Sequence, residues 1–169
     1  DDDDSGGDTA PEPWVPYTQV DLGFYDTCAV RQDSTIRCWG DGSTDSEAPT
    51  SSGWASVSVG ERHACALTTG GTIACWGSDI YDPTEAPAGT FQAVEAGSDH
   101  SCAIDTSGEI SCWGRSTSWQ TTAPDGRYEK LAMSGHTNCA LDASDIATCW
   151  GFNGAGQTDP PGDEFMTIS

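Results

Sequence analysis

The stretch CALTTGGTIACWG at residues 65–77 decides the fold, because its pattern returns three more times along the chain. The other copies begin at Cys28, Cys102 and Cys139, so the pattern recurs every 37 residues without deviation. A fixed period between about 20 and 50 residues indicates a repeat architecture. Four copies account for nearly all of the 169 residues. We therefore expect one array of four repeats.

Each copy is typical of three short strands. Residues 65–67 and 73–76 flank Thr69-Gly70-Gly71, which fits a three-residue hairpin loop with a glycine in the left-handed position. Ahead of them, an aromatic residue leads into alternating apolar and polar residues, as in Phe91–Ala96, and a period of two indicates a strand. The other segments of this kind begin at Tyr17, Trp54 and Tyr128. No segment has a helical period, so an all-β fold is predicted.

The composition excludes several classes of protein. There are 6 Lys+Arg against 27 Asp+Glu, and a net charge of -21 repels nucleic acid phosphates and anionic lipid. No apolar run approaches the ~20 residues of a membrane span. Hydrophobic residues make up only 36%, and 20 Gly with 9 Pro favour turns over helices. We expect no nucleic acid partner, no membrane span and no helical bundle.

Eight cysteines in an acidic chain indicate a disulfide framework and an oxidising compartment. Two pairings respect the repeat. One closes each copy on itself, because a hairpin centred on Gly70 places residues 65 and 75 opposite each other. The other joins Cys38 to Cys65 and leaves Cys28 and Cys149 over. We favour the first, with bridges Cys28–Cys38, Cys65–Cys75, Cys102–Cys112 and Cys139–Cys149, each stabilising by roughly 2–3 kcal/mol.

A tryptophan follows the second cysteine of every copy and falls on the strand face opposite the disulfides. An alanine shares that face, and large residues facing small ones favour packing between neighbouring sheets. Stacking of a sugar on these rings is the alternative interpretation. The four tryptophans are Trp39, Trp76, Trp113 and Trp150, and the alanines are Ala29, Ala66, Ala103 and Ala140.

The repeat resembles the regulator of chromosome condensation family of β-propeller repeats, whose bacterial secreted members include β-lactamase inhibitor protein II. The motif lies in Gly60–Leu67 followed by Cys75-Trp76-Gly77, and returns at Gly97–Ile104. The family's loop Trp-Gly-x-Asn-x-x-Gly-Gln is intact once, at Trp150–Gln157. The resemblance implies propeller blades, although the family typically closes seven of them. Its members bind unrelated proteins, so the fold does not name a function.

Nothing in the sequence predicts an enzyme or a cofactor. His63 and His100 recur in phase, but no nucleophile or carboxylate recurs with them, and we expect them to hydrogen-bond the adjacent turn. Zinc is disfavoured because there are only 3 His and no C-x-x-C. The acidic loops could offer oxygen ligands to Ca²⁺ through Asp41, Asp45 and Glu47, or through Asp79 and Asp82. They match no calcium-loop spacing, and we predict no metal site.

The loops that follow each tryptophan differ in chemistry while the frame stays fixed, as binding loops on a scaffold do. They are residues 41–47, 78–85, 115–122 and 152–159. Tyr81 and Trp119 are predicted to be exposed there and to contact a partner, since aromatic residues anchor many interfaces.

The two ends of the chain differ from the repeats. Residues 1–13 are predicted to be an acidic disordered linker ahead of a domain at 14–169. A fifth aromatic-led segment, with Phe165 and Ile168, would be an extra C-terminal strand. Such a strand either folds back on the chain or adds to the open sheet of another molecule, which closes a ring or continues as a fibre.

The sequence therefore predicts a non-enzymatic module for protein association. We expect it to be exported and to be extracellular or on the cell surface, and a lipid tether ahead of residue 1 is a further option. Self-association head to tail through terminal strand exchange, with Phe165 and Ile168 as contacts, is the leading hypothesis. The alternative is a monomeric secreted propeller that binds or inhibits a foreign protein, or binds a glycan, with its variable loops.

Overall fold

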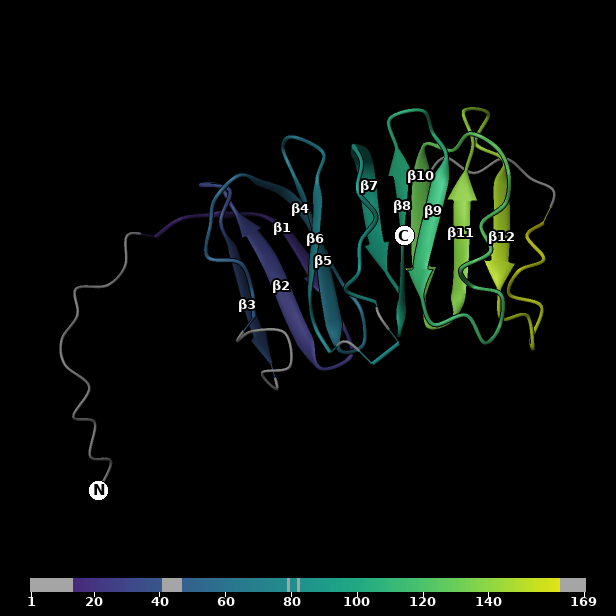
Figure 1. Cartoon of the computed structure of the whole chain (residues 1–169), viewed down its shortest axis with the longest axis horizontal. Coiled ribbons are helices and arrows are strands. Elements are labelled where there is room, and N and C mark those ends of the chain that lie inside the picture. Colours follow the sequence, from purple (N-terminus) through teal and green to yellow (C-terminus); the bar gives the residue numbers. More distant parts are fainter. Residues whose placement is uncertain (1–13, 41–46, 79, 82, 162–169) are drawn as a thin grey trace, which may run out of the picture.

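The computed structural model describes residues 14–40, 47–78, 80–81 and 83–161, and these contain twelve strands. The strands form four sheets that stand side by side in chain order (Figure 1). The first sheet is β1 Tyr17–Leu22, β2 Asp26–Arg31 and β3 Ile36–Gly40; the second is β4 Trp54–Val59, β5 His63–Thr68 and β6 Ile73–Gly77; the third is β7 Phe91–Ala96, β8 His100–Asp105 and β9 Ile110–Gly114; the fourth is β10 Lys130–Ser134, β11 Thr137–Leu141 and β12 Ala147–Gly151.

Every sheet is antiparallel and has its strands in sequence order. Cys65 on β5 is paired directly with Cys75 on β6, and the two are bridged. The same bridge links the second and third strands of the other three sheets. The pairing within each repeat is thus confirmed, and the alternative bridge between Cys38 and Cys65 is wrong.

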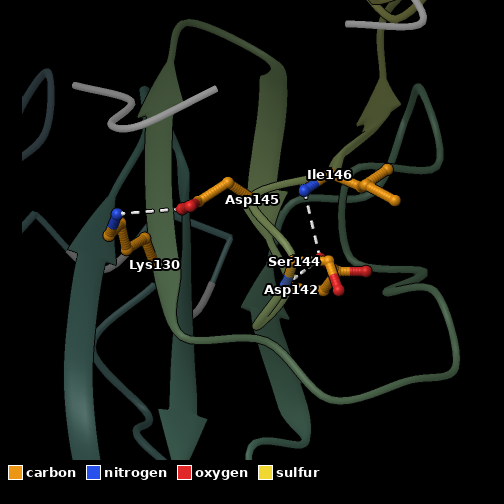
Figure 2. A network of polar contacts seen from close by, with 5 residues as sticks. All are labelled: Lys130, Asp142, Ser144, Asp145 and Ile146. Carbon is orange, nitrogen blue, oxygen red and sulfur yellow. Dashed lines mark hydrogen bonds and ion pairs between the residues drawn. The ribbon is translucent and has the colours of Figure 1, made fainter. Parts of the chain in front are cut away.

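The hairpin between the second and third strands has the same backbone shape in all four sheets. Its left-handed residue is Ser34, Gly71, Gly108 or Asp145, with φ of 61°, 84°, 92° and 59°. In the fourth hairpin, the Asp142 carboxylate accepts the backbone N–H groups of Ser144 at 2.8 Å and Ile146 at 3.0 Å (Figure 2). The recurring turn is therefore held by local side-chain contacts as well as by the strand ladder.

Neighbouring sheets bury two different faces against each other. We call the side with the cystine the disulfide face, and the opposite side, with the tryptophan, the Trp face. Cys28, Val30 and Ile36 on the disulfide face of the first sheet pack with Val57 and Trp76 on the Trp face of the second. The second and third sheets, and the third and fourth, are joined in the same way.

The inner strands β1, β4, β7 and β10 bring the backbones of adjacent sheets very close together at one end. A Cβ on Gly60 would lie 2.3 Å from the Gly97 carbonyl oxygen, and one on Gly23 would lie 2.1 Å from the Gly60 carbonyl oxygen. Real Cβ atoms do not approach so closely. Gly23 and Gly60, which follow β1 and β4, are therefore needed for the approach of the next sheet.

Some predictions concern residues outside those that the structure describes. These are the acidic linker at 1–13, the loop acids Asp41, Asp45, Asp79 and Asp82, and the terminal segment with Phe165 and Ile168. Within the described ranges, no helix is long and apolar enough to cross a membrane.

Candidate functional site

The Trp face of the first sheet is open, although it carries an aromatic residue, an apolar residue and a tryptophan at the same positions as the covered faces. Tyr17 is 55% exposed, Val20 55% and Trp39 47%. Their equivalents in the second sheet are Trp54 at 6%, Val57 at 1% and Trp76 at 7%. The third and fourth sheets resemble the second: Phe91 and Tyr128 are each 6% exposed, Val94 is 4% and Leu131 7%.

This open face carries apolar side chains beside the exposed Arg37, and two of its rings contact each other. The Tyr17 and Trp39 rings are 6.3 Å apart and tilted by 55°. Leu22, on the same face of β1, is 70% exposed. A contiguous exposed apolar patch on a soluble protein marks an interaction site. The repeat pattern predicts the same packing role for Trp39 as for the other three tryptophans, and its position in the first copy is the only signal in the sequence that it differs.

Polar contacts complete each joint between sheets. The Gln19 side chain accepts the backbone N–H of Val57 at 2.8 Å and donates to its carbonyl at 3.0 Å. His63 Nε2 lies 2.8 Å from Ser101 Oγ, and His100 Nε2 donates to Asn138 Oδ1 at 2.7 Å. Both histidine side chains thus reach the next sheet, and the expectation that they bond the adjacent turn is corrected, since the turn at Gly60 or Gly97 is closed by backbone hydrogen bonds.

Burial sets the ionisation of these groups. It lowers the pKa of His63 to about 4, and it also lowers the pKa of His100. Burial, followed by the Asp21 carboxylate, raises the pKa of Glu95 to about 7, against the Ser58 hydroxyl that donates to it at 3.0 Å. His63 and Ser101 resemble a base and a nucleophile, but they are 1% and 0% exposed, which leaves no room for a substrate.

The loop aromatics predicted to contact a partner are exposed and have unusual backbone angles. Tyr81 is 50% exposed with a φ of 82°, and Trp119 is 76% exposed with a φ of 63°. The Arg115 guanidinium stacks 4.8 Å from the Tyr81 ring centre and pairs with Asp99 at 3.0 Å. Contact with a partner at these residues stays a prediction.

The loops also have a role that sequence analysis missed. The indole N–H of Trp113 donates to the Pro83 carbonyl at 2.8 Å, and that of Trp150 donates to the Gln120 carbonyl at 2.9 Å. The loop after the second sheet therefore caps the tryptophan of the third sheet, and the loop after the third sheet caps the tryptophan of the fourth. A backbone acceptor has no sequence signature. The only signal in the sequence was that Gln120 stands where the family loop has its glutamine.

An open hollow of about 400 Å³ lies where the inner strands end, and every repeat contributes one segment to it. Its lining is residues 22–24, 59–61, 96–98 and 133–135, with Glu61 as the one carboxylate. Among the described residues, no three metal-binding side chains gather anywhere. The hollow thus brings together backbone and apolar groups rather than acids and bases.

A protein-family model matches two of the four repeats. The model describes the regulator of chromosome condensation (RCC1) repeat and covers residues 54–81 and 91–118. These two segments match the RCC1 repeat in sequence. They contain the Gly60 and Gly97 motifs on which the resemblance was based. No curated protein matches the chain.

Solved structures extend the RCC1 likeness to most of the chain. The CRINKLY WD40 ectodomain of the Arabidopsis thaliana receptor kinase ACR4 is 25% identical with a TM-score of 0.72, over 94% of this chain and 58% of that one. The ectodomain of the Physcomitrella patens receptor kinase CR4 is 26% identical with a TM-score of 0.68, over 81% and 40%. Yeast RCC1, solved with Kap60 bound, is 15% identical with a TM-score of 0.71, over 84% and 45%.

The resemblance and the fold class predicted from the sequence are both confirmed. The chain has an RCC1-type propeller architecture of four disulfide-bridged sheets, and it spans about half the length of these relatives. Yeast RCC1 is bound to Kap60 in its crystal structure.

Proposed function

We propose that this chain is a non-enzymatic extracellular assembly module whose copies associate head to tail. The open Trp face of the first sheet would dock on the disulfide face of the fourth sheet of a second copy. One observation carries this proposal. Tyr17, Val20 and Trp39 are about half exposed, whereas their equivalents are buried where a preceding sheet covers them, apart from Trp113, which is partly buried.

The favoured occupant of the open face is a disulfide face because a disulfide face covers the Trp face of the second, third and fourth sheets, together with a capping loop in the third and fourth. Three internal joints use this pairing. On the fourth sheet, Leu141 is buried, but Cys139, Ala147 and Cys149 are half-buried and form the accessible part of the disulfide face. Two different surfaces that fit each other give a heterologous contact, which produces a ring or a fibre.

Strand exchange is a finer version of the same proposal, and its residues Phe165 and Ile168 lie outside the described ranges. Deleting residues 162–169 separates the two versions. Association through strand exchange would be lost, and association through the faces would persist. Light scattering on the deleted chain measures the outcome.

The proposed location follows from the cystines, since the chain contains four bridges and no free cysteine. Disulfides of this density persist in oxidising compartments. The net charge of -21 opposes association at low ionic strength, so the contact is expected to form best in salt near the physiological level of about 0.15 M.

Blocking the two ends separately tests the head-to-tail arrangement. Val20→Arg places a charge on the open Trp face, and Ala147→Arg places one on the half-buried disulfide face of the fourth sheet. We expect each variant alone to sediment as a monomer and an equimolar mixture to form a one-to-one dimer, because each variant keeps one intact end. Ile80→Arg is the matched control, since Ile80 is 64% exposed in a loop of the second repeat.

The proposal is overturned if the unaltered chain sediments as a monomer at tens of micromolar in about 0.15 M salt. It is also overturned if the mixture stays monomeric, or if the control variant blocks association as strongly as the other two.

A second function, binding of a foreign protein by the loops, is favoured by Tyr81 and Trp119. Both are exposed and have left-handed backbone angles. Such strain costs on the order of 1–3 kcal/mol and is concentrated at functional sites. The end-blocking variants leave these loops unchanged, so a chain that stays monomeric would favour this alternative.

A further inference from the structure

We propose that the joint between copies has one register, in which the loop after β12 receives Trp39 of the second copy and the Gln157 carbonyl accepts its indole N–H. This inference rests on the proposed head-to-tail association. It adds a specific acceptor site and a specific register, neither of which association alone requires.

The internal joints set the precedent. Pro83 caps Trp113 and Gln120 caps Trp150, and in both cases the acceptor precedes the tryptophan by 30 residues. The polar contacts from inner strand to inner strand are equally regular, with Gln19 to Val57 separated by 38 residues. If the same step continues from the fourth sheet into a second copy, the residue that meets Trp39 is Gln157.

The loop after β12 already has the conformation of a cap. The Gln157 side-chain oxygen accepts the Ala155 backbone N–H at 2.7 Å, as the Gln120 oxygen accepts that of Ser118 at 2.6 Å. The residue before each glutamine is left-handed, with φ of 63° at Trp119 and 80° at Gly156. Local contacts therefore preform this loop without a docked tryptophan.

Further bonds hold the same loop. Asn153 Oδ1 accepts the Thr158 backbone N–H at 2.9 Å, and Asn153 Nδ2 donates to Asp159 at 3.1 Å. The difference between the two caps lies in their burial, since Gln120 is 0% exposed and Gln157 is exposed. The fourth repeat thus presents an ordered cap to solvent, while the first repeat presents an exposed tryptophan.

A conservative pair of substitutions tests the hydrogen bond. Trp39→Phe keeps an aromatic ring and removes only the indole N–H with part of the ring. Since one hydrogen bond contributes about 0.5–1.5 kcal/mol, we expect the dissociation constant from sedimentation to rise roughly 2- to 10-fold. Ile80→Val is the control and should leave the constant unchanged, because Ile80 is exposed in a loop of the second repeat. Equal constants for Trp39→Phe and the unaltered chain would overturn the inference.

A photo-cross-linker tests the register directly. Benzoylphenylalanine replaces Trp39 in an unlabelled chain, which is mixed with a ¹⁵N-labelled unaltered chain and irradiated. Mass spectrometry should find labelled peptides that contain residues 153–159. The same probe at Tyr81 should not reach them.

The outcomes separate this inference from the proposal on which it rests. Cross-links from residue 39 to another surface, such as the first sheet of the labelled chain, would overturn the register and leave association standing. A mixture that is monomeric by sedimentation overturns both. Cross-links to 153–159 together with the weakened Trp39→Phe contact support the inference.

Discussion

The first and second sheets have nearly the same pattern of residues and opposite environments. Each offers an aromatic at the start of its inner strand, a valine three residues on, and a tryptophan after the second cysteine. In the first sheet these are Tyr17, Val20 and Trp39, each about half exposed, and in the second they are at most 7% exposed. The repeat therefore encodes which faces fit together, and burial depends on whether a neighbouring sheet is present.

The largest expected difference between the two sheets is the energetic cost of removing the tryptophan. Truncation of a buried tryptophan costs about 3–5 kcal/mol. Trp76 is 7% exposed and Trp39 is 47% exposed. We therefore expect Trp76→Ala to lower the free energy of unfolding by several kcal/mol and Trp39→Ala to lower it by less than about 1 kcal/mol. Urea unfolding of the monomeric, disulfide-intact chain measures both values.

The protein concentration is the control for that comparison. If Trp39 contributes to the free energy of unfolding through contact with a second copy, its contribution must grow with protein concentration. The contribution of Trp76 must not depend on protein concentration. Equal losses for the two variants in dilute solution would mean that the first sheet is covered within a single chain.

The second expected effect concerns an acid in the middle of the array. Burial raises the pKa of Glu95 on β7 from 4.5 to about 7. The folded state therefore holds this proton more tightly, and its contribution to stability is present below pH 4.5 and lost as the pH rises through about 7. Glu95→Gln should raise the free energy of unfolding at pH 8 by up to about 3 kcal/mol and change it little at pH 4.5. Thermal unfolding against pH measures this difference.

The histidines give the opposite slope and act as an internal control. His63 has a folded pKa of about 4, below its usual 6.5, so stability is lost as the pH falls through 6.5 towards 4. This loss should be the same in Glu95→Gln. A variant that is no more stable than the unaltered chain at pH 8 would contradict the buried acid.

The spacing of the cysteines explains why so much of the fold could be predicted. A gap of 10 residues around a glycine turn allows little besides a hairpin, and the pairing of Cys65 with Cys75 follows. The site was harder to predict. The environment of Trp39 depends on a neighbour that its local sequence does not mention, and the caps at Pro83 and Gln120 act through backbone carbonyls.

The histidines show a second limit. Their recurrence indicated a structural role, but their hydrogen-bond partners, Ser101 and Asn138, belong to the following repeat and differ from each other. A contact between neighbouring sheets is visible in one sequence only when both partners recur in phase, and here only the histidine does.

The third expected effect compares a joint with a hairpin of the same sheet. A Cβ on Gly60 would meet the Gly97 carbonyl oxygen at 2.3 Å, whereas one on Gly70 has its nearest neighbour at 3.8 Å. Gly60→Ala should destabilise by about 1–3 kcal/mol because the adjacent backbone must move. Gly70→Ala, the matched control, should be nearly neutral. Urea midpoints for the two variants test this, and similar midpoints would mean that the joint tolerates extra volume.

The smallest effect is kinetic and compares the cystines of the two outer sheets. In the first sheet Cys28 is 0% exposed and Cys38 8%, because its disulfide face is covered by the second sheet. In the fourth sheet Cys139 and Cys149 are half-buried. Since thiol–disulfide exchange requires access to a sulfur, limited reduction of the dilute chain should open Cys139–Cys149 before Cys28–Cys38. Alkylation and peptide mapping at successive times give the order.

Raising the protein concentration should slow the opening of Cys139–Cys149 alone, because the proposed contact covers that face. If Cys28–Cys38 opened first, or if concentration protected both bridges equally, the two ends would not differ in the way the exposures require.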